Sequence, residues 1–216
     1  VSGTSRISGT VTQYSPAPPR LTPIPPTGFT VPPTPKPSTF TASGPNQVVS
    51  WNNDLVLAPN TAAGTAVSGA PSYGALSLGG RNVLTLSTGN YYFTSISANT
   101  QVTLRLDLSG GPINIFVTGA VTLGDRFYVQ VSSNGSNYVT MTSATAALAA
   151  KSYMETHSTL TTGNLGQWFG TIYASGNINF DSSNTIIGSY YTAQSLISGS
   201  SPTVTYVQSD YAKAHW

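Results

Sequence analysis

Glu155 and His157 are the two side chains of this sequence whose types and spacing are best suited to chemistry. One residue separates them, and alternate side chains of a β-strand point to the same face. A carboxylate beside an imidazole can support acid–base catalysis, and the two could also hold a metal ion. No third ligand is evident nearby, and His215 is remote in sequence. A hydrogen-bonded pair with a structural role is the alternative, and it is the one that we favour.

The other carboxylates are scattered along the chain. Glycoside hydrolysis needs two carboxyl groups about 5–9 Å apart. Asp107 and Asp125 could stack on successive strands, but both lie beside glycine-rich segments, where Asp is a common turn residue. The sequence also contains no Gly-x-Ser-x-Gly nucleophile elbow. We therefore predict that the protein is not an enzyme and needs no cofactor. A polysaccharide-degrading enzyme is the less favoured alternative.

Charge is scarce in this chain. Charged residues make up 6% of it and the net charge is +2, against about 25% charged residues in an ordinary soluble domain. The basic residues form no run, which argues against a nucleic-acid partner. No apolar stretch reaches the length of a membrane span. The absence of cysteine excludes disulfides and a thiol nucleophile.

The chain opens on Val1 rather than on methionine, from which we expect export with removal of a signal peptide. Residues 1–15 are β-prone, with Ile7, Val11 and Tyr14 as their main apolar residues, and residues 16–45 read as a Pro-rich extended linker. Two interpretations of the β-prone segment stay open. It crosses the surface of its own domain, or it is a strand that pairs with a sheet edge of another subunit.

Residues 46–216 have a sequence pattern that is typical of a folded β domain. Short apolar-alternating runs are separated by Gly, Asn and Ser; they lie at residues 83–86, 91–93, 102–106, 113–117, 121–123, 128–131, 138–141, 171–173 and 178–180. Phe93, Phe116 and Val139 are evenly spaced along the chain, and a slightly shorter interval separates Thr171 from Tyr190. Repeats of roughly 20 residues, as here, are typical of β-solenoid coils.

We predict an all-β fold: a single-stranded β-solenoid (β-helix) of about five to six short coils. A small helical insert is expected at residues 144–151, and the extended Pro-rich arm precedes the solenoid. A β-sandwich is the alternative. It would show several two-residue hairpin turns, of which Asn134-Gly135 is the one good candidate.

Four stretches carry a family resemblance. They are VLTLSTGNYYF at residues 83–93, DLSGGPINIFVTG at 107–119, ETH at 155–157 and QWFGTIYA at 167–174. In this order they resemble bacterial exported β-helical repeat domains of the kind found in PEP-CTERM-sorted (choice-of-anchor) and pilus-associated surface proteins. The resemblance covers residues 53 to 197. It implies secretion and a β-helical fold, and it implies no particular activity.

Aromatic and threonine residues suggest surfaces for binding. Tyr91, Trp168 and Tyr190 each belong to an adjacent aromatic pair, so strand alternation should expose one member for stacking on sugars or on a neighbouring subunit. Thr85, Thr103, Thr122 and Thr140 recur at nearly equal intervals. An ice-binding face would need a Thr-x-Thr motif at each of these positions, and the sequence does not have one at each. Ice binding is therefore less favoured.

The open edges of a solenoid invite pairing with other chains. We therefore expect an extracellular structural protein, a subunit of a surface filament, sheath or layer that self-associates through the N-terminal strand and the solenoid edges. The alternative is a secreted adhesin or glycan-binding module whose partner is a cell-surface polysaccharide.

Overall fold

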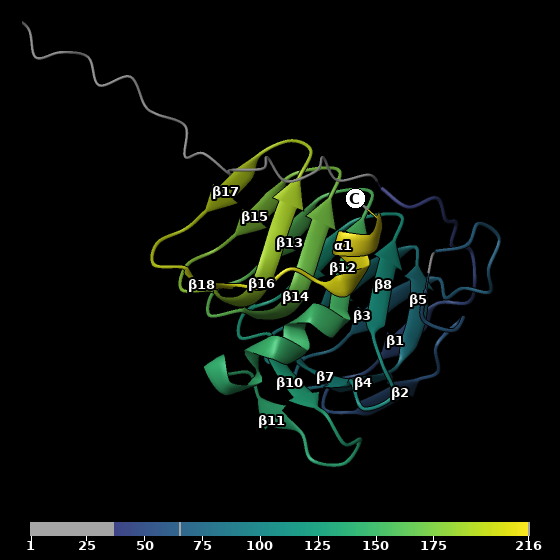
Figure 1. Ribbon diagram of the computed structural model, residues 1–216, viewed down its shortest axis with the longest axis horizontal. Coiled ribbons are helices and arrows are strands. Elements are labelled where there is room, and N and C mark those ends of the chain that lie inside the picture. The colour runs from purple at the N-terminus through teal and green to yellow at the C-terminus, as the bar shows by residue number, and fades with distance from the viewer. Residues whose placement is uncertain (1–36, 65, 216) are drawn as a thin grey trace, which may run out of the picture. The chain divides into compact units, whose positions relative to one another are not determined.

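The computed structural model describes residues 37–64 and 66–215. They lie within the second of two compact units, Thr34–Trp216, and the first unit, Val1–Pro33, falls outside them. Strands dominate, and the described helices are the 3-10 helix η1 (Ser143–Lys151) and α1 (Asp210–His215) (Figure 1). The predicted all-β class and the helical insert are confirmed. Neither of these helices is long and apolar enough to cross a membrane.

The strands form three sheets. Sheet A has the order β1 (Gln47–Val49), β3 (Ala75–Leu78), β6 (Ser95–Ala98), β9 (Val121–Leu123), β13 (Leu160–Thr162), β15 (Ile178–Phe180) and β17 (Leu196–Ser198). Sheet B has the order β11 (Val139–Thr140), β10 (Tyr128–Ser132), β7 (Thr103–Asp107), β4 (Val83–Ser87) and β2 (Asp54–Leu57). Sheet C has the order β18 (Thr203–Tyr206), β16 (Thr185–Thr192), β14 (Gln167–Ala174), β12 (Ser152–Thr156), β8 (Ile113–Val117) and β5 (Gly89–Phe93).

The chain visits the sheets in turn. β3, β4 and β5 belong to sheets A, B and C, and β6, β7 and β8 repeat that order. After the β10–β11 hairpin, η1 leads into β12, and from β13 to β18 the chain alternates between sheets A and C. Strands of successive passes pair in parallel, and β10–β11 is the antiparallel exception among the strand pairs of the described residues.

The even spacing of Phe93, Phe116 and Val139 does not reflect the pairing of the strands. Phe93 pairs with Val117 rather than with Phe116, and Val139 lies in the hairpin strand β11 instead of a third coil. The residues chosen to mark the repeat are wrong, whereas a repeat of roughly 20 residues agrees with pairs such as Leu84 and Leu104. The interval varies because the loops at the corners differ in length. Apolar residues can then recur at one spacing along the sequence while the main-chain pairing follows another.

The second predicted repeat is wrong by one position, and the threonines do not align. Thr171 pairs with Ser189 rather than with Tyr190 in sheet C. Thr85 and Thr103 both lie in sheet B but at different ladder positions, and Thr122 lies in sheet A. The four threonines singled out in the sequence therefore do not form one row on one face.

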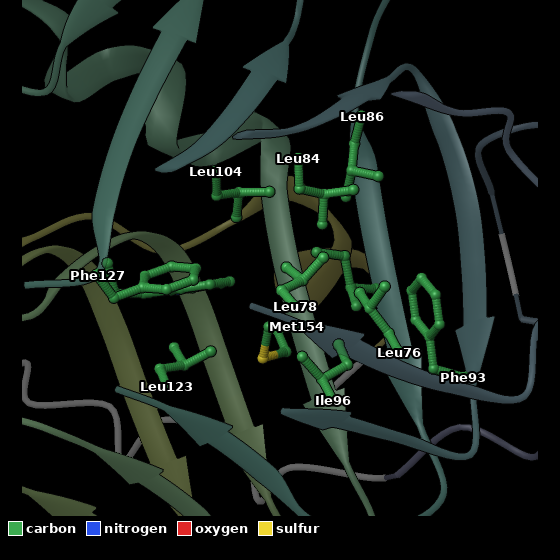
Figure 2. Close-up of a pocket in the computed structure, with 12 residues that line it drawn as sticks. Leu76, Leu78, Leu84, Leu86, Phe93, Ile96, Leu104, Leu123, Phe127 and Met154 are labelled. Carbon is green, nitrogen blue, oxygen red and sulfur yellow. The ribbon is translucent and has the colours of Figure 1, made fainter. Parts of the chain in front are cut away.

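Aliphatic and aromatic side chains fill the space between the sheets. Figure 2 shows side chains from several strands pointing toward one another, among them Leu84, Leu104 and Phe127. These and other apolar residues line a cavity of about 20 Å³. A cavity of this kind stays dry. It is a packing defect of the inner core, and the chemistry of the molecule has to be sought elsewhere.

Two stacked glycines interrupt the longest strands of sheet C. Gly170 of β14 pairs with Gly188 of β16, and both have positive φ angles, of 116° and 155°. A Cβ atom on Gly188 would overlap the carbonyl oxygen of Gly170. Only glycine combines this backbone conformation with so close an approach of two strands.

Strands β5, β8 and β12 of sheet C are buried on both faces, whereas β18 at the other end of the same sheet is exposed. None of the residues of β5, β8 and β12 is exposed. The face turned away from the inner core carries a second cluster of packed side chains: Phe40, Tyr92, Phe116, Tyr153, Tyr173, Tyr211 and Ala212. Phe40 comes from the segment assigned above to the linker, and Tyr211 comes from α1, which contacts β12 (Figure 1). We call Ser38, Phe40 and α1 the cover of sheet C.

Candidate functional site

Strand β12 places Glu155 on the covered face of sheet C. Side chains alternate along a strand, and accordingly Tyr153 belongs to the second cluster whereas Met154 belongs to the inner core. His157 follows directly after the strand, and its Nε2 lies 2.7 Å from Oε1 of Glu155. The contact expected between these two side chains is present.

Three groups donate hydrogen bonds to the carboxylate of Glu155. The backbone N–H of Ser38 lies 2.7 Å from Oε1, and the hydroxyl of Tyr153 lies 2.9 Å from Oε2. The third donor is Nε2 of His157, because an ionised carboxylate can only accept. The side chain of Glu155 is 0% exposed, whereas that of His157 is 30% exposed. A buried charge is tolerated when it has this many donors.

The cover closes over this carboxylate from two directions. The hydroxyls of Ser38 and Tyr211 lie 2.8 Å apart. The ring of Tyr211 stacks on that of Tyr153 at 4.5 Å, and the ring of Phe40 lies 4.5 Å from that of His157. Glu155 is therefore the point at which three segments far apart in the sequence meet.

The phenols around the carboxylate are held in their neutral form. Burial raises the pKa of Tyr211, and the negative charge of Glu155 raises it further. The pKa of Tyr173 is raised by the same two causes in the same order. A tyrosinate beside a buried carboxylate would add repulsion between like charges, so these rings act as apolar bodies with hydroxyl donors.

We expect the protein to lose stability at alkaline pH. Burial and contacts with Tyr206 raise the pKa of Tyr191 from 10.0 to about 12, and burial also raises the pKa of Tyr91, Tyr173 and Tyr211. Phenols of the unfolded chain ionise first, so the melting temperature should stay level below the unfolded value of 10.0 and fall as the pH rises toward 12. Thermal unfolding followed across this range tests it, and a melting temperature unchanged up to pH 12 contradicts it.

The chemistry available at this site is limited to one carboxylate and one imidazole. No group of three His, Cys, Asp or Glu side chains within residues 37–64 and 66–215 could hold a metal ion. The carboxylates of Asp107 and Asp125 are used locally: Asp107 accepts from Ser109, and Asp125 accepts from the backbone of Asn164. This geometry suits the structural interpretation of the Glu155–His157 pair.

The predicted exposure of Tyr91 and Trp168 is wrong. Tyr91 is 0% and Trp168 2% exposed, and both belong to the inner core. Their neighbours Tyr92 and Phe169 are buried too, because the cover and η1 occupy the other face of sheet C. Tyr190 is half-buried and packs edge-on against the ring of Phe180. These three residues form no exposed aromatic surface, and the assembly residues Ile7, Val11 and Tyr14 lie outside the described part of the chain.

Exposed apolar side chains gather on the terminal strands of the sheets. At the C-terminal end they are Leu196 and Ile197 of β17 and Val204 and Tyr206 of β18. At the other end they are Val48 of β1 and Val56 of β2. Every residue of β17 and β18 is exposed. Sequence reasoning expected open edges but did not identify these residues.

Two open grooves lie along sheet A. The first is lined by residues such as Ser77, Ser97 and Thr122, together with Asp125 at the corner that follows β9. The second continues the same row of strands, with Thr161, Asn179 and Ile197 among its lining residues. Hydroxyl and amide groups line much of the first groove, whereas the second is more apolar because Phe180 and Ile197 contribute to it.

The cover is the part of the site that sequence reasoning missed. Ser38 and Phe40 stand beside the Pro-rich run and resemble a linker, and Tyr211 lies near the C-terminus. One signal was available. The runs at residues 91–93 and 113–117 are almost continuously apolar instead of alternating, which is typical of strands with both faces buried.

Comparison with known families gives one match. A family model described as "Domain of unknown function (DUF7305)" matches residues 59–210, which is more than half of the 216 residues. The comparisons with curated proteins and with solved structures found no match. The matched range contains Glu155 and His157 but neither Ser38, Phe40 nor Tyr211. The three side chains that close the site therefore lie outside the range of the family model.

Proposed function

We propose that this chain, which belongs to the DUF7305 family, is an extracellular structural protein that folds as a β-solenoid and assembles through its sheet edges. The order in which the chain visits sheets A, B and C, with parallel pairing of successive passes, supports the solenoid. The resemblance to exported β-helical repeat domains of bacterial surface proteins supports the location. A subunit of a surface filament, sheath or layer is the role that fits both.

The observation that carries this proposal is the open end formed by β17 and β18. Leu196 is 43% and Val204 42% exposed, yet both stand in ladder register with buried core residues, Ile178 and Ile186. Repeat proteins normally end in a capping unit with a polar outer face. Apolar residues of the core pattern that are exposed at a sheet edge form a surface that another chain can cover.

The low charge of the chain favours close packing of identical subunits. Six acidic and eight basic residues are spread over 216 positions, so copies meet with little repulsion. A neutral polar surface also has few ionic groups to desolvate when subunits come together.

Assembly can be tested with edge variants. We expect the purified protein to form filaments or sheets in negative-stain microscopy and to scatter more light as its concentration rises. Leu196→Lys should reduce assembly about tenfold or more, since it places a charge at the apolar edge. Val67→Lys is the matched control, because Val67 is an exposed valine in a loop. Equal assembly of both variants, or a protein that stays monomeric at every concentration, contradicts the proposal.

A glycan-binding role is the second candidate, and the grooves on sheet A are the observation that favours it. Their hydroxyl and amide lining offers hydrogen bonds to a neutral polysaccharide without requiring charge. Co-sedimentation with an insoluble neutral polysaccharide distinguishes the two roles. Binding that Thr122→Trp abolishes and Leu196→Lys leaves intact would favour the adhesin.

A further inference from the structure

The outward-facing row of side chains on sheet A changes character at its two ends. Main-chain pairing aligns one residue of each strand in this row: Val48, Ser77, Ser97, Thr122, Thr161, Asn179 and Ile197. The five inner positions carry hydroxyl or amide groups, as expected for a solvated face. The two edge positions carry Val48, 76% exposed, and Ile197, 57% exposed.

The inward-facing row of the same sheet is buried along most of its length and becomes exposed at β17. From β1 to β17 it consists of Gln47, Leu76, Ile96, Val121, Leu160, Ile178 and Leu196. The five residues from Leu76 to Ile178 in this row are 7% exposed or less, whereas Leu196 is 43% exposed. At β17, apolar side chains therefore stand at the edge on both faces of the sheet.

The two edges of sheet A are complementary to one another. In the described part of the chain β1 pairs only with β3 and β17 pairs only with β15, so one side of each strand is free of sheet partners. All strands of sheet A are parallel, so a second copy placed in line would bring its β1 beside β17 in the same direction. Neither strand carries a charged residue, and no ionic group needs to be desolvated on contact.

The corresponding edge of sheet C is less accessible. Its N-terminal edge strand, β5, is bridged by Thr61 at Asn90, and the backbone N–H of Tyr92 in the same strand donates to the side chain of Asn60. A partner that pairs with main-chain groups therefore finds a free N-terminal edge in β1 rather than in β5.

We propose that β17 of one copy pairs in parallel with β1 of a second copy, so that Ile197 lies beside Val48 of the next molecule. The inference rests on the proposed self-assembly and names the two surfaces that perform it. The contact joins two different surfaces and does not close on itself, so repetition gives an open filament in which sheet A runs from subunit to subunit. In this register Gln47 of the incoming strand lies beside Leu196, so the main chain and the side-chain methylene groups of Gln47 cover the core row that ends there.

Engineered cysteines test this pairing directly, because the chain has no cysteine of its own. Neighbouring strands lie about 4.8 Å apart, which is within the Cα separation that a disulfide spans. We mix full-length Val48→Cys with full-length Ile197→Cys under mild oxidation and separate the products on a non-reducing gel. The expected result is a cross-linked dimer, about tenfold more abundant than with Ser77→Cys in place of Val48→Cys, because proximity raises the effective thiol concentration.

The single variants and one further pair show which occupant covers β17. Ile197→Cys alone should give little dimer, and efficient cross-linking of it alone means a two-fold contact, which overturns the head-to-tail arrangement. Cross-linking of Ile7→Cys with Ile197→Cys in place of the Val48 pair means that the N-terminal segment occupies the edge, which also overturns it. Assembly seen by light scattering without any Val48–Ile197 cross-link overturns this inference alone. A protein that stays monomeric overturns the proposed function with it.

Discussion

Glu155→Ala should lower the free energy of unfolding by about 3–5 kcal/mol, because it leaves more than one buried hydrogen-bond donor without its acceptor. The substitution takes the acceptor from Ser38, Tyr153 and His157 at once. Tyr153 is fully buried, so its hydroxyl cannot turn to water without opening the cover. Urea unfolding followed by tyrosine and tryptophan fluorescence measures the change.

Two variants serve as controls for this substitution. Asp181→Ala removes an exposed carboxylate that accepts from the backbone N–H of Ser182 at a corner, and we expect a change of about 1 kcal/mol or less. Glu155→Gln keeps the shape and one acceptor oxygen, so its effect should lie between the two. If Glu155→Ala costs no more than Asp181→Ala, the carboxylate does not hold the cover in place.

Sequence patterns predicted sheets A and B better than sheet C. In β4 and β7 apolar and polar residues alternate, and Leu84 and Leu104 point inward as the period of two requires. In sheet C the same rule failed at Tyr91 and Trp168. Alternation assigns one face of a strand to water, and β5 and β14, which carry these two residues, have no such face.

Only the part of the site formed by residues close together in sequence could be predicted. Glu155 and His157 are separated by a single residue, so the geometry of one strand was enough to bring them together. Ser38 and Phe40 come from a segment near the start of the described chain, and Tyr211 comes from its C-terminal helix. No periodicity links these three residues to β12. Proline-rich flanks also point to an extended linker, and local composition cannot indicate that Phe40 packs on a sheet.

Phe40 is the apolar anchor of the cover, and Phe40→Ala should lower the free energy of unfolding by about 3 kcal/mol or more. The ring is 5% exposed and lies 5.3 Å from that of Phe116 and 6.0 Å from that of Tyr92. Its removal leaves a void above sheet C that the short, proline-flanked segment cannot easily fill. Phe40→Leu, which keeps most of the apolar volume, should cost less than half as much.

The double variant of Phe40→Ala with Glu155→Ala tests whether the cover acts as one unit. Each substitution detaches the same segment, because Ser38 donates to Glu155 and Phe40 follows closely in the chain. The second substitution then has less left to remove, so the combined loss should fall short of the sum by about 1 kcal/mol or more. Leu104→Ala, in the inner core on sheet B, should instead add to Glu155→Ala within about 0.5 kcal/mol. Strict additivity of the first pair would mean that the aromatic contacts and the hydrogen bond to Glu155 hold the segment independently.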